Sequence, residues 1–83
     1  MNTYHIENWG TWFGSLLGQR VEDNKPVTTS NVQRVEGNVA YTKNSAYVLG
    51  KPSQGFVEYC TNEGIMLDLD NFESTFELLG CLK

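Results

Sequence analysis

The chain has 83 residues, 40% of them hydrophobic, which allows one domain over residues 1–83 with a single modest core. Its formal net charge of −4, with only six Lys and Arg, argues against a direct grip on nucleic-acid phosphates, because such binding needs clustered cations. The sequence has no apolar run of membrane-span length and no signal-peptide pattern, so we expect a cytoplasmic protein with no membrane partner.

Short runs of β-type residues, separated by Gly and Asn, occupy the first fifty residues. We expect four short strands before the middle of the chain, with Pro26 ending the pairing after a turn at residues 23–26. The expected strands are residues 3–6, 12–17, 19–22 and 27–29. Their order in a sheet does not follow from these local patterns.

The clearest local pattern is a three-strand antiparallel meander over residues 32–50. Gly37-Asn38 is a two-residue loop of the kind that joins hairpin strands, and Asn44-Ser45 is the second expected loop. Counting outward from these loops predicts two cross-strand rows on opposite faces of the sheet. The rows are Arg34, Tyr41 and Val48 on one face and Gln33, Thr42 and Tyr47 on the other. Such a small sheet rolls easily into a partial barrel.

The C-terminal part of the chain has helical patterning. We expect Ser53 to cap a first helix that Gly64 ends in the left-handed conformation. Asp70, followed three residues later by Glu73, predicts a capping box for a second helix that ends at Gly80. The predicted fold class is therefore α+β, a small antiparallel β-meander or partial barrel followed by two short C-terminal helices.

The sequence contains no recognised catalytic or metal-binding motif. His5 is the only histidine, and no partnered Ser, Cys or carboxylate motif accompanies it. The spacing between Cys60 and Cys81 is not that of metal ligands, so we expect buried thiols, with a disulfide as the alternative. We therefore expect no enzyme activity, no cofactor and no metal site.

Polar, cationic and phenolic side chains gather in and around the predicted meander. Hydroxyl and amide groups can satisfy phosphate or ribose oxygens, a guanidinium supplies a planar cation, and phenol rings supply stacking surfaces. We expect these residues to bind a small nucleotide-derived ligand, although the same residue types also fill ordinary turns and exposed strand faces. They are Thr28, Thr29, Ser30, Asn31, Arg34, Tyr41, Thr42, Lys43, Asn44, Ser45 and Tyr47.

Residues 52–82 contain six acidic residues and no Lys or Arg. This block predicts a negative face, which either keeps a small protein soluble or docks on a basic surface of a protein partner. The acidic residues are Glu58, Glu63, Asp68, Asp70, Glu73 and Glu77.

Residues 26–32 and 39–50 resemble a pattern in small uncharacterised proteins of phages and prophages. That pattern reads Thr-Ser, an apolar pair, a Gly turn and then Thr-x-Ser-Gly-Ser-x-Tyr-x-Leu-Gly. This chain departs from it at Asn44-Ser45, where the pattern has Ser-Gly. The resemblance covers less than a third of the chain, and it implies a phage setting, a shared β-meander and a role in countering host defence in the host cytoplasm.

We conclude that the sequence predicts a non-catalytic protein that sequesters a small nucleotide-derived ligand. We expect a homo-oligomer, because a core of this size is marginal alone and association would bury more surface. We expect Trp9 and Trp12 to pack in the core, with an exposed association surface as the alternative. One rival function is inhibition of a host defence complex through the acidic C-terminal face, and another is a structural or accessory phage component.

Overall fold

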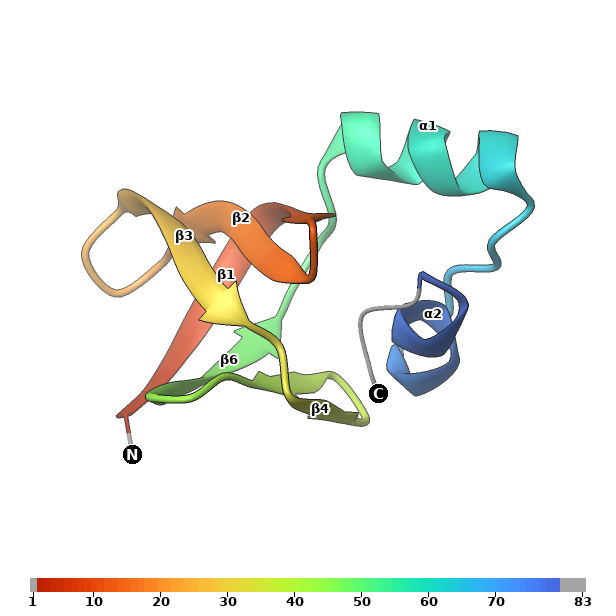
Figure 1. Cartoon of the computed structure of the whole chain (residues 1–83). Coiled ribbons are helices and arrows are strands. Elements are labelled where there is room, and N and C mark those ends of the chain that lie inside the picture. The colour runs from red at the N-terminus through yellow and green to blue at the C-terminus, as the bar shows by residue number, and fades with distance from the viewer. Residues whose placement is uncertain (1, 80–83) are drawn as a thin grey trace.

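The computed structural model describes residues 2–79, which form six strands followed by two helices (Figure 1). The strands are β1 (Asn2–Trp12), β2 (Ser15–Arg20), β3 (Lys25–Asn31), β4 (Arg34–Glu36), β5 (Val39–Tyr41) and β6 (Ser45–Leu49). The helices are α1 (Gln54–Glu63) and α2 (Glu73–Leu78). This arrangement confirms the predicted α+β class. The expected helix stop at Gly80 and the second cysteine, Cys81, lie outside the described residues.

The six strands form one mixed sheet in the order β3-β2-β1-β6-β5-β4. Neighbouring strands are antiparallel except β1 and β6, which run parallel from Asn2 opposite Ser45 to Ile6 opposite Leu49. The sheet is strongly curved but does not close into a barrel (Figure 1). Its two halves are therefore joined by a pairing between segments about forty residues apart, which no local pattern predicts.

Three expectations for the N-terminal half are wrong. Residues 19–22 are not a separate strand and the turn is not at 23–26, because β2 continues to Arg20 and residues 21–24 form the turn. Residues 12–17 are not one strand, because Phe13-Gly14 forms a two-residue turn between β1 and β2. Both turn residues have positive φ, 48° and 86°, as a type I′ hairpin requires. Pro26 does not end pairing but lies within β3 opposite Gln19. Proline is tolerated there because β3 is an edge strand, with no neighbour on its outer side.

The meander forms, but only its first hairpin has the predicted register. Arg34 lies opposite Tyr41, which confirms the prediction from the first loop. Tyr41, however, lies opposite Ala46 and not Val48. The second loop is therefore Lys43-Asn44, one residue earlier than expected. The flanking residues are already paired, because the Thr42 N–H donates a hydrogen bond to the Ser45 carbonyl at 2.8 Å.

Helix α1 begins and ends as predicted. The Ser53 hydroxyl oxygen accepts a hydrogen bond from the Phe56 N–H at 3.2 Å, and Gly64 ends the helix with φ of 71°. Neither α1 nor α2, the helices found in residues 2–79, is long and apolar enough to cross a membrane.

Helix α2 begins differently from the prediction, without a capping box between Asp70 and Glu73. The Glu73 N–H donates instead to Asn71 Oδ1 at 2.9 Å. The Glu73 carboxylate accepts from the Gly37 N–H at 3.4 Å, and the Phe72 N–H donates to the Gly37 carbonyl at 2.8 Å. The start of α2 is thus bonded to the β4–β5 turn, which competes with the local cap that the sequence suggests.

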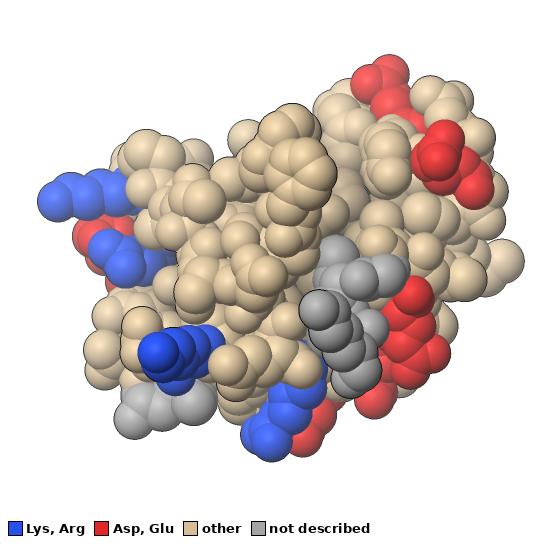
Figure 2. All heavy atoms as spheres, in the orientation of Figure 1, with Lys and Arg blue, Asp and Glu red and all other residues tan. Residues whose placement is uncertain are grey.

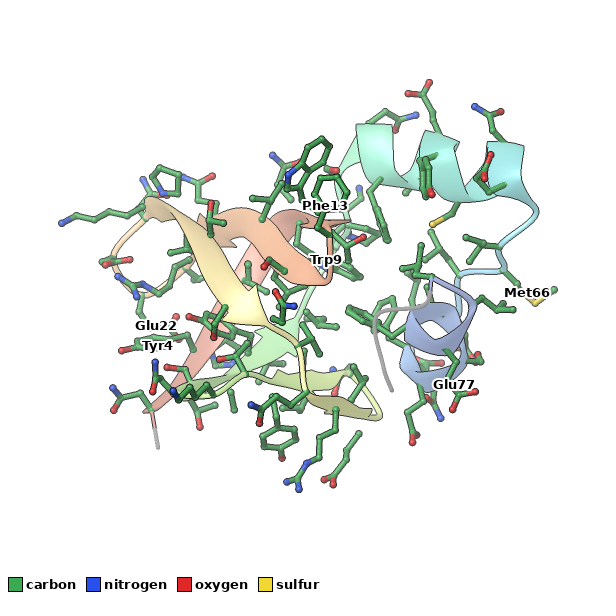
Figure 3. All side chains as sticks on the ribbon, viewed as in Figure 1. Tyr4, Trp9, Phe13, Glu22, Met66 and Glu77 are labelled. Carbon is green, nitrogen blue, oxygen red and sulfur yellow. The ribbon has the colours of Figure 1, made fainter. Side chains whose placement is uncertain are left out.

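Trp9 is the centre of the core, as predicted. Its side chain is fully buried, and Figure 3 shows it between the sheet and the helices. Its ring centroid lies 5.1 Å from that of Phe56, 5.0 Å from that of Phe72 and 6.0 Å from that of Phe76. Its Nε1–H donates to the Gly50 carbonyl at 2.8 Å, so the one polar atom of the ring is satisfied.

A β-bulge in β1 directs Trp9 into this cluster. The register between β1 and β2 shifts around Asn8, which has φ of 52°. The Asn8 N–H donates to the Lys51 carbonyl at 2.8 Å, and the Ser53 N–H donates to the Trp9 carbonyl at 2.8 Å. The chain that leads into α1 is therefore hydrogen-bonded to the bulge, which sets where α1 begins relative to the sheet.

A substitution at Gly18 on β2 tests the packing around Trp9. A Cβ at Gly18 would lie 2.8 Å from Ile6 Cγ1 and 2.9 Å from Trp9 Cβ, closer than van der Waals contact allows. We predict that Gly18→Ala lowers the free energy of unfolding by about 1–3 kcal/mol in urea denaturation. The control is Gly55→Ala on α1, where a Cβ meets nothing within 4 Å and Ala favours the helix by up to about 1 kcal/mol. Equal stability of the two variants would contradict the packing described.

Candidate functional site

An open cleft of about 920 Å³ lies between the β1–β2 turn and α1. Its rims carry aromatic rings, with Trp12 and Phe13 from the turn and Tyr59 from α1. Figure 3 shows Phe13 at the turn, beside the start of α1. The lining also includes apolar Leu17 and Phe56. The bulge that buries Trp9 positions both sides of the cleft. The β1–β2 turn follows the bulge along β1, and the start of α1 is held by the hydrogen bonds between the bulge and the segment before α1.

The three aromatic side chains at the rim are exposed. The exposed fraction is 62% for Trp12, 84% for Phe13 and 51% for Tyr59. The rings of Trp12 and Phe13 contact each other edge to face, with centroids 4.8 Å apart. The expectation that Trp12 packs in the core is therefore wrong, because the bulge turns Trp9 inward and the hairpin turn then carries Trp12 away from the core.

Phe13 occupies a backbone conformation that disfavours it. Its φ of 48° lies in the left-handed region, which Gly, Asn and Asp adopt most readily and in which a bulky side chain is an outlier. Such outliers cluster at functional sites, where the local cost is retained for the sake of the exposed group. An exposed aromatic ring at this turn position thus indicates a surface with a binding role.

The cleft is mainly apolar, and the described residues that line it carry no charge. Besides the rings, its lining includes the side chains of Asn8, Thr11, Asn31 and Ser53. Among residues 2–79, no Lys, Arg, Asp or Glu lines it, although the chain has six bases and ten acids. Rings with amide and hydroxyl groups between them suit a planar ligand that carries hydrogen-bonding edges.

The predicted ligand residues on β3 are only partly available. Asn31 lines the cleft, where its Oδ1 accepts from the Ser15 hydroxyl at 3.1 Å. Thr28 and Ser30 are exposed along the same edge strand. The Thr29 hydroxyl oxygen accepts from the backbone N–H of Leu16 and belongs to the structure of the sheet.

Arg34 and Tyr41 are brought together, as the register predicts. The guanidinium carbon lies 4.3 Å from the centroid of the Tyr41 ring, and Arg34 Nε lies 3.3 Å from the Glu36 carboxylate. The Arg34 side chain keeps an exposed fraction of 62%, and Lys43 and Asn44 are exposed in the adjacent loop. These side chains form a polar strip away from the cleft.

Two predicted ligand residues face the interior. Thr42 is 3% exposed, and its hydroxyl donates to the Ser45 carbonyl at 3.0 Å. Ser45, half-buried, donates its N–H back to the Thr42 hydroxyl oxygen at 3.3 Å. Tyr47 is 7% exposed and packs with its ring centroid 5.7 Å from that of Tyr4. The interpretation of Thr42 and Tyr47 as surface binding groups is therefore wrong, because both lie on the face of the meander that also carries Ala40, and this face packs into the core.

The predicted acidic face forms on the helical part of the molecule. All six of its carboxylates are exposed, and none pairs with a cation among residues 2–79. Figure 2 shows acidic side chains gathered over the helical part of the visible face and Lys and Arg over the sheet, and Figure 3 shows Glu77 pointing away from α2. Met66 and Leu69, with exposed fractions of 79% and 60%, add apolar surface to the same region.

Cys60 is buried, as predicted, and burial raises the pKa of its thiol. Within the described residues it is a free cysteine, and no group of three or more His, Cys, Asp or Glu side chains is placed to hold a metal ion there.

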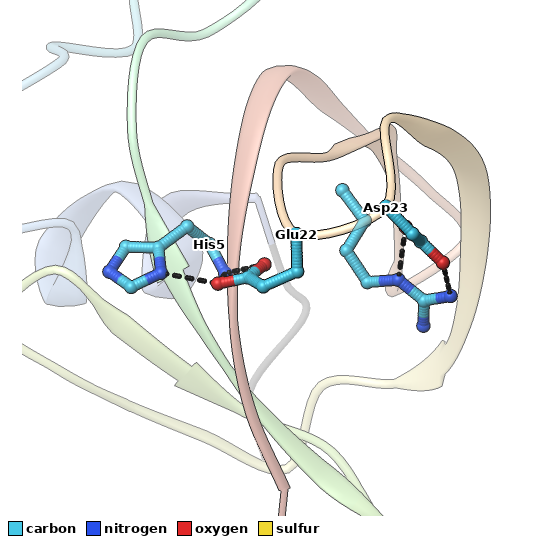
Figure 4. A network of polar contacts seen from close by, with 4 residues as sticks. His5, Glu22 and Asp23 are labelled. Atoms are coloured by element: carbon cyan, nitrogen blue, oxygen red, sulfur yellow. Dashed lines mark hydrogen bonds and ion pairs between the residues drawn. The ribbon is translucent and has the colours of Figure 1, made fainter.

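His5 has a partner that sequence spacing does not reveal (Figure 4). Its Nδ1 lies 2.7 Å from Glu22 Oε2, and its backbone N–H donates to both carboxylate oxygens at 2.9 and 3.2 Å. Next to this contact Asp23 pairs with Arg20, whose guanidinium lowers the pKa of that carboxyl. These contacts tie β1 to the β2–β3 turn, and neither His5 nor Glu22 lines the cleft.

Comparisons with protein-family models, with curated proteins and with solved structures find no match to this chain.

The His5–Glu22 contact makes a prediction about pH. The pKa of Glu22 is lowered from 4.5, first by the hydrogen bond from the His5 side chain and then by the His5 backbone N–H. A carboxyl with a lowered folded-state pKa stabilises the fold above its unfolded pKa and loses that contribution as the pH falls through the folded value. We predict that His5→Ala raises the pKa of Glu22 in a carbon-detected NMR titration. An unchanged pKa would contradict the contact.

Proposed function

We propose that this protein is a non-catalytic binding protein that sequesters a small nucleotide-derived ligand in the aromatic cleft. The observation that carries the proposal is the exposed set of Trp12, Phe13 and Tyr59 around a mainly apolar hollow whose lining also includes amide and hydroxyl residues. Aromatic side chains stack on any nucleobase, and stacking contributes about 1–3 kcal/mol per base. The amides of Asn8 and Asn31 offer donors and acceptors to the edge of a base.

The absence of charged residues from the described lining of the cleft determines which part of the ligand enters the cleft. No cation lines the cleft among residues 2–79, so phosphate groups gain little there, while a base gains stacking and hydrogen bonds. Asn31 is the predicted ligand residue that lies at the cleft, and the exposed Thr28 and Ser30 continue from it along β3. In this proposal the base enters the cleft and the sugar and phosphate extend over β3.

The biological role is proposed from the resemblance to small phage proteins. A protein without catalytic machinery lowers the concentration of a signal molecule only by holding it, which requires abundant copies and a closed site. We therefore propose a homo-oligomer that acts in the host cytoplasm and withholds a nucleotide-derived signal from host defence. Binding of such a ligand stabilises the folded protein by mass action.

Calorimetric titration with nucleosides and with linear and cyclic nucleotides tests the cleft. We predict that Trp12→Ala and Tyr59→Ala each weaken binding by about tenfold or more, since each removes a stacking ring. Both side chains are exposed, so both variants are expected to fold. The control is Arg34→Ala, which removes an exposed cation outside the cleft and leaves affinity unchanged. Affinity that rises with phosphate number and falls in Arg34→Ala would contradict the location of the site.

A second candidate function is the inhibition of a host defence complex through the acidic face. It is suggested by the acidic side chains that pair with no cation in the described part of the chain and that lie beside exposed Met66 and Leu69. In that case Glu63→Lys combined with Glu77→Lys sharply reduces co-purification with the defence complex and its salt sensitivity, while Tyr59→Ala has no effect. The ligand proposal requires the opposite ranking of these variants.

A further inference from the structure

The geometry of the β1–β2 turn points to a contact with a second copy of this chain. We propose that two copies pair about a two-fold axis through their Trp12–Phe13 turns, so that the turn of each copy covers the open side of the other's cleft. This inference rests on the proposed function, because it makes the partner's turn part of the ligand site.

The first argument is that the protrusion and the hollow lie side by side. Phe13 projects from the turn with an exposed fraction of 84%, and the cleft begins at the same residue. A two-fold axis brings one patch of surface against the same patch of a second copy. A patch that has a protruding side chain next to a cleft can therefore be complementary to itself. A stable interface covers about 800 Å² per partner, roughly 15% of the 5210 Å² accessible surface, with large aromatic anchors near its centre. Trp12, Phe13 and Tyr59 provide such a centre.

The second argument is that the charge of the cleft lining favours a second copy of the chain as the partner that covers the cleft. A two-fold contact brings one patch against the same patch of the second copy, so a patch that carried charge of one sign would repel itself. The residues that line the cleft in the described part of the chain include no charge. A strongly basic or acidic protein would find no counter-charge in this lining, and a lipid surface would find no cation for its headgroups. A second copy of the same uncharged surface meets neither obstacle.

The third argument is the backbone of Phe13. Asn and Gly are the residues that a type I′ turn prefers, and Phe13 with φ of 48° departs from that preference at the most exposed ring of the cleft. Within the single chain the Phe13 ring contacts Trp12 edge to face, but most of the ring stays exposed. Burial against a second copy would give this exposed part of the ring apolar contact.

Pairing would also complete the ligand site. The cleft volume of about 920 Å³ is at the upper end of the range for small-molecule sites, and the cleft is open on one side. A ring from the partner's turn, entering from that side, would place the base between two aromatic surfaces. By linkage, the ligand then strengthens the dimer and the dimer strengthens ligand binding by the same factor.

Sedimentation velocity without ligand tests the pairing, with Phe13→Asn as the variant. Asn followed by Gly14 is the preferred sequence of a type I′ turn, so this variant is expected to form the hairpin and to fold. We predict that the natural protein is a dimer at micromolar concentration, that Phe13→Asn raises the dimer dissociation constant by about tenfold or more, and that salt has little effect on either. The control is Leu69→Asn, which removes an exposed apolar side chain outside the cleft and leaves the dimer intact.

Three outcomes would overturn the inference. These are a natural protein that stays monomeric, a Phe13→Asn variant that dimerises as the natural protein does, and a dimer that dissociates as salt is raised. Ligand binding by a monomer would overturn the pairing and leave the proposed function standing. A dimer that binds no nucleoside or nucleotide would instead overturn the proposed function and leave the pairing standing.

Discussion

The burial of Trp9 at a β-bulge is the interaction on which the rest of the structure depends. The indole ring holds aromatic side chains from α1, from the segment before α2 and from α2 itself in one cluster. The bulge supplies the backbone hydrogen bonds that receive the segment entering α1. In a chain of 83 residues, with a core that is small relative to its surface, Trp9 is the largest of the fully buried side chains. The same inward turn of Trp9 leaves Trp12 outside, at the rim of the cleft.

The features predicted correctly are those with a local physical cause. Gly37-Asn38 sets a hairpin register because a two-residue loop leaves no freedom in counting, and Ser53 and Gly64 bound α1 because capping uses atoms within a few residues. The meander shows the limit, because the alternation of side chains places Thr42 and Tyr47 on one face, whereas packing against the rest of the chain decides that this face is buried.

The candidate site was predicted least well, because long-range packing forms it. The parallel pairing of β1 with β6 and the contact of the bulge with the segment before α1 join residues that are far apart in sequence. Phe13-Gly14 was missed because the turn has Phe where Asn or Gly is usual. Only Asn31, of the predicted ligand residues, lines the cleft. The available signal is the pair Trp9 and Trp12, which the sequence predicts to pack in the core, with an exposed association surface as the alternative.

The central claim, that a base enters the aromatic cleft, is tested most directly by NMR of the two indole N–H groups during titration with a nucleoside. The chain has two Trp residues, one buried with its N–H bonded to the Gly50 carbonyl and one exposed at the cleft. The account predicts that the Trp12 signal shifts progressively and saturates, while the Trp9 signal stays close to its starting position. A saturating titration in which the Trp12 signal does not move, or in which only groups around Arg34 respond, would contradict it.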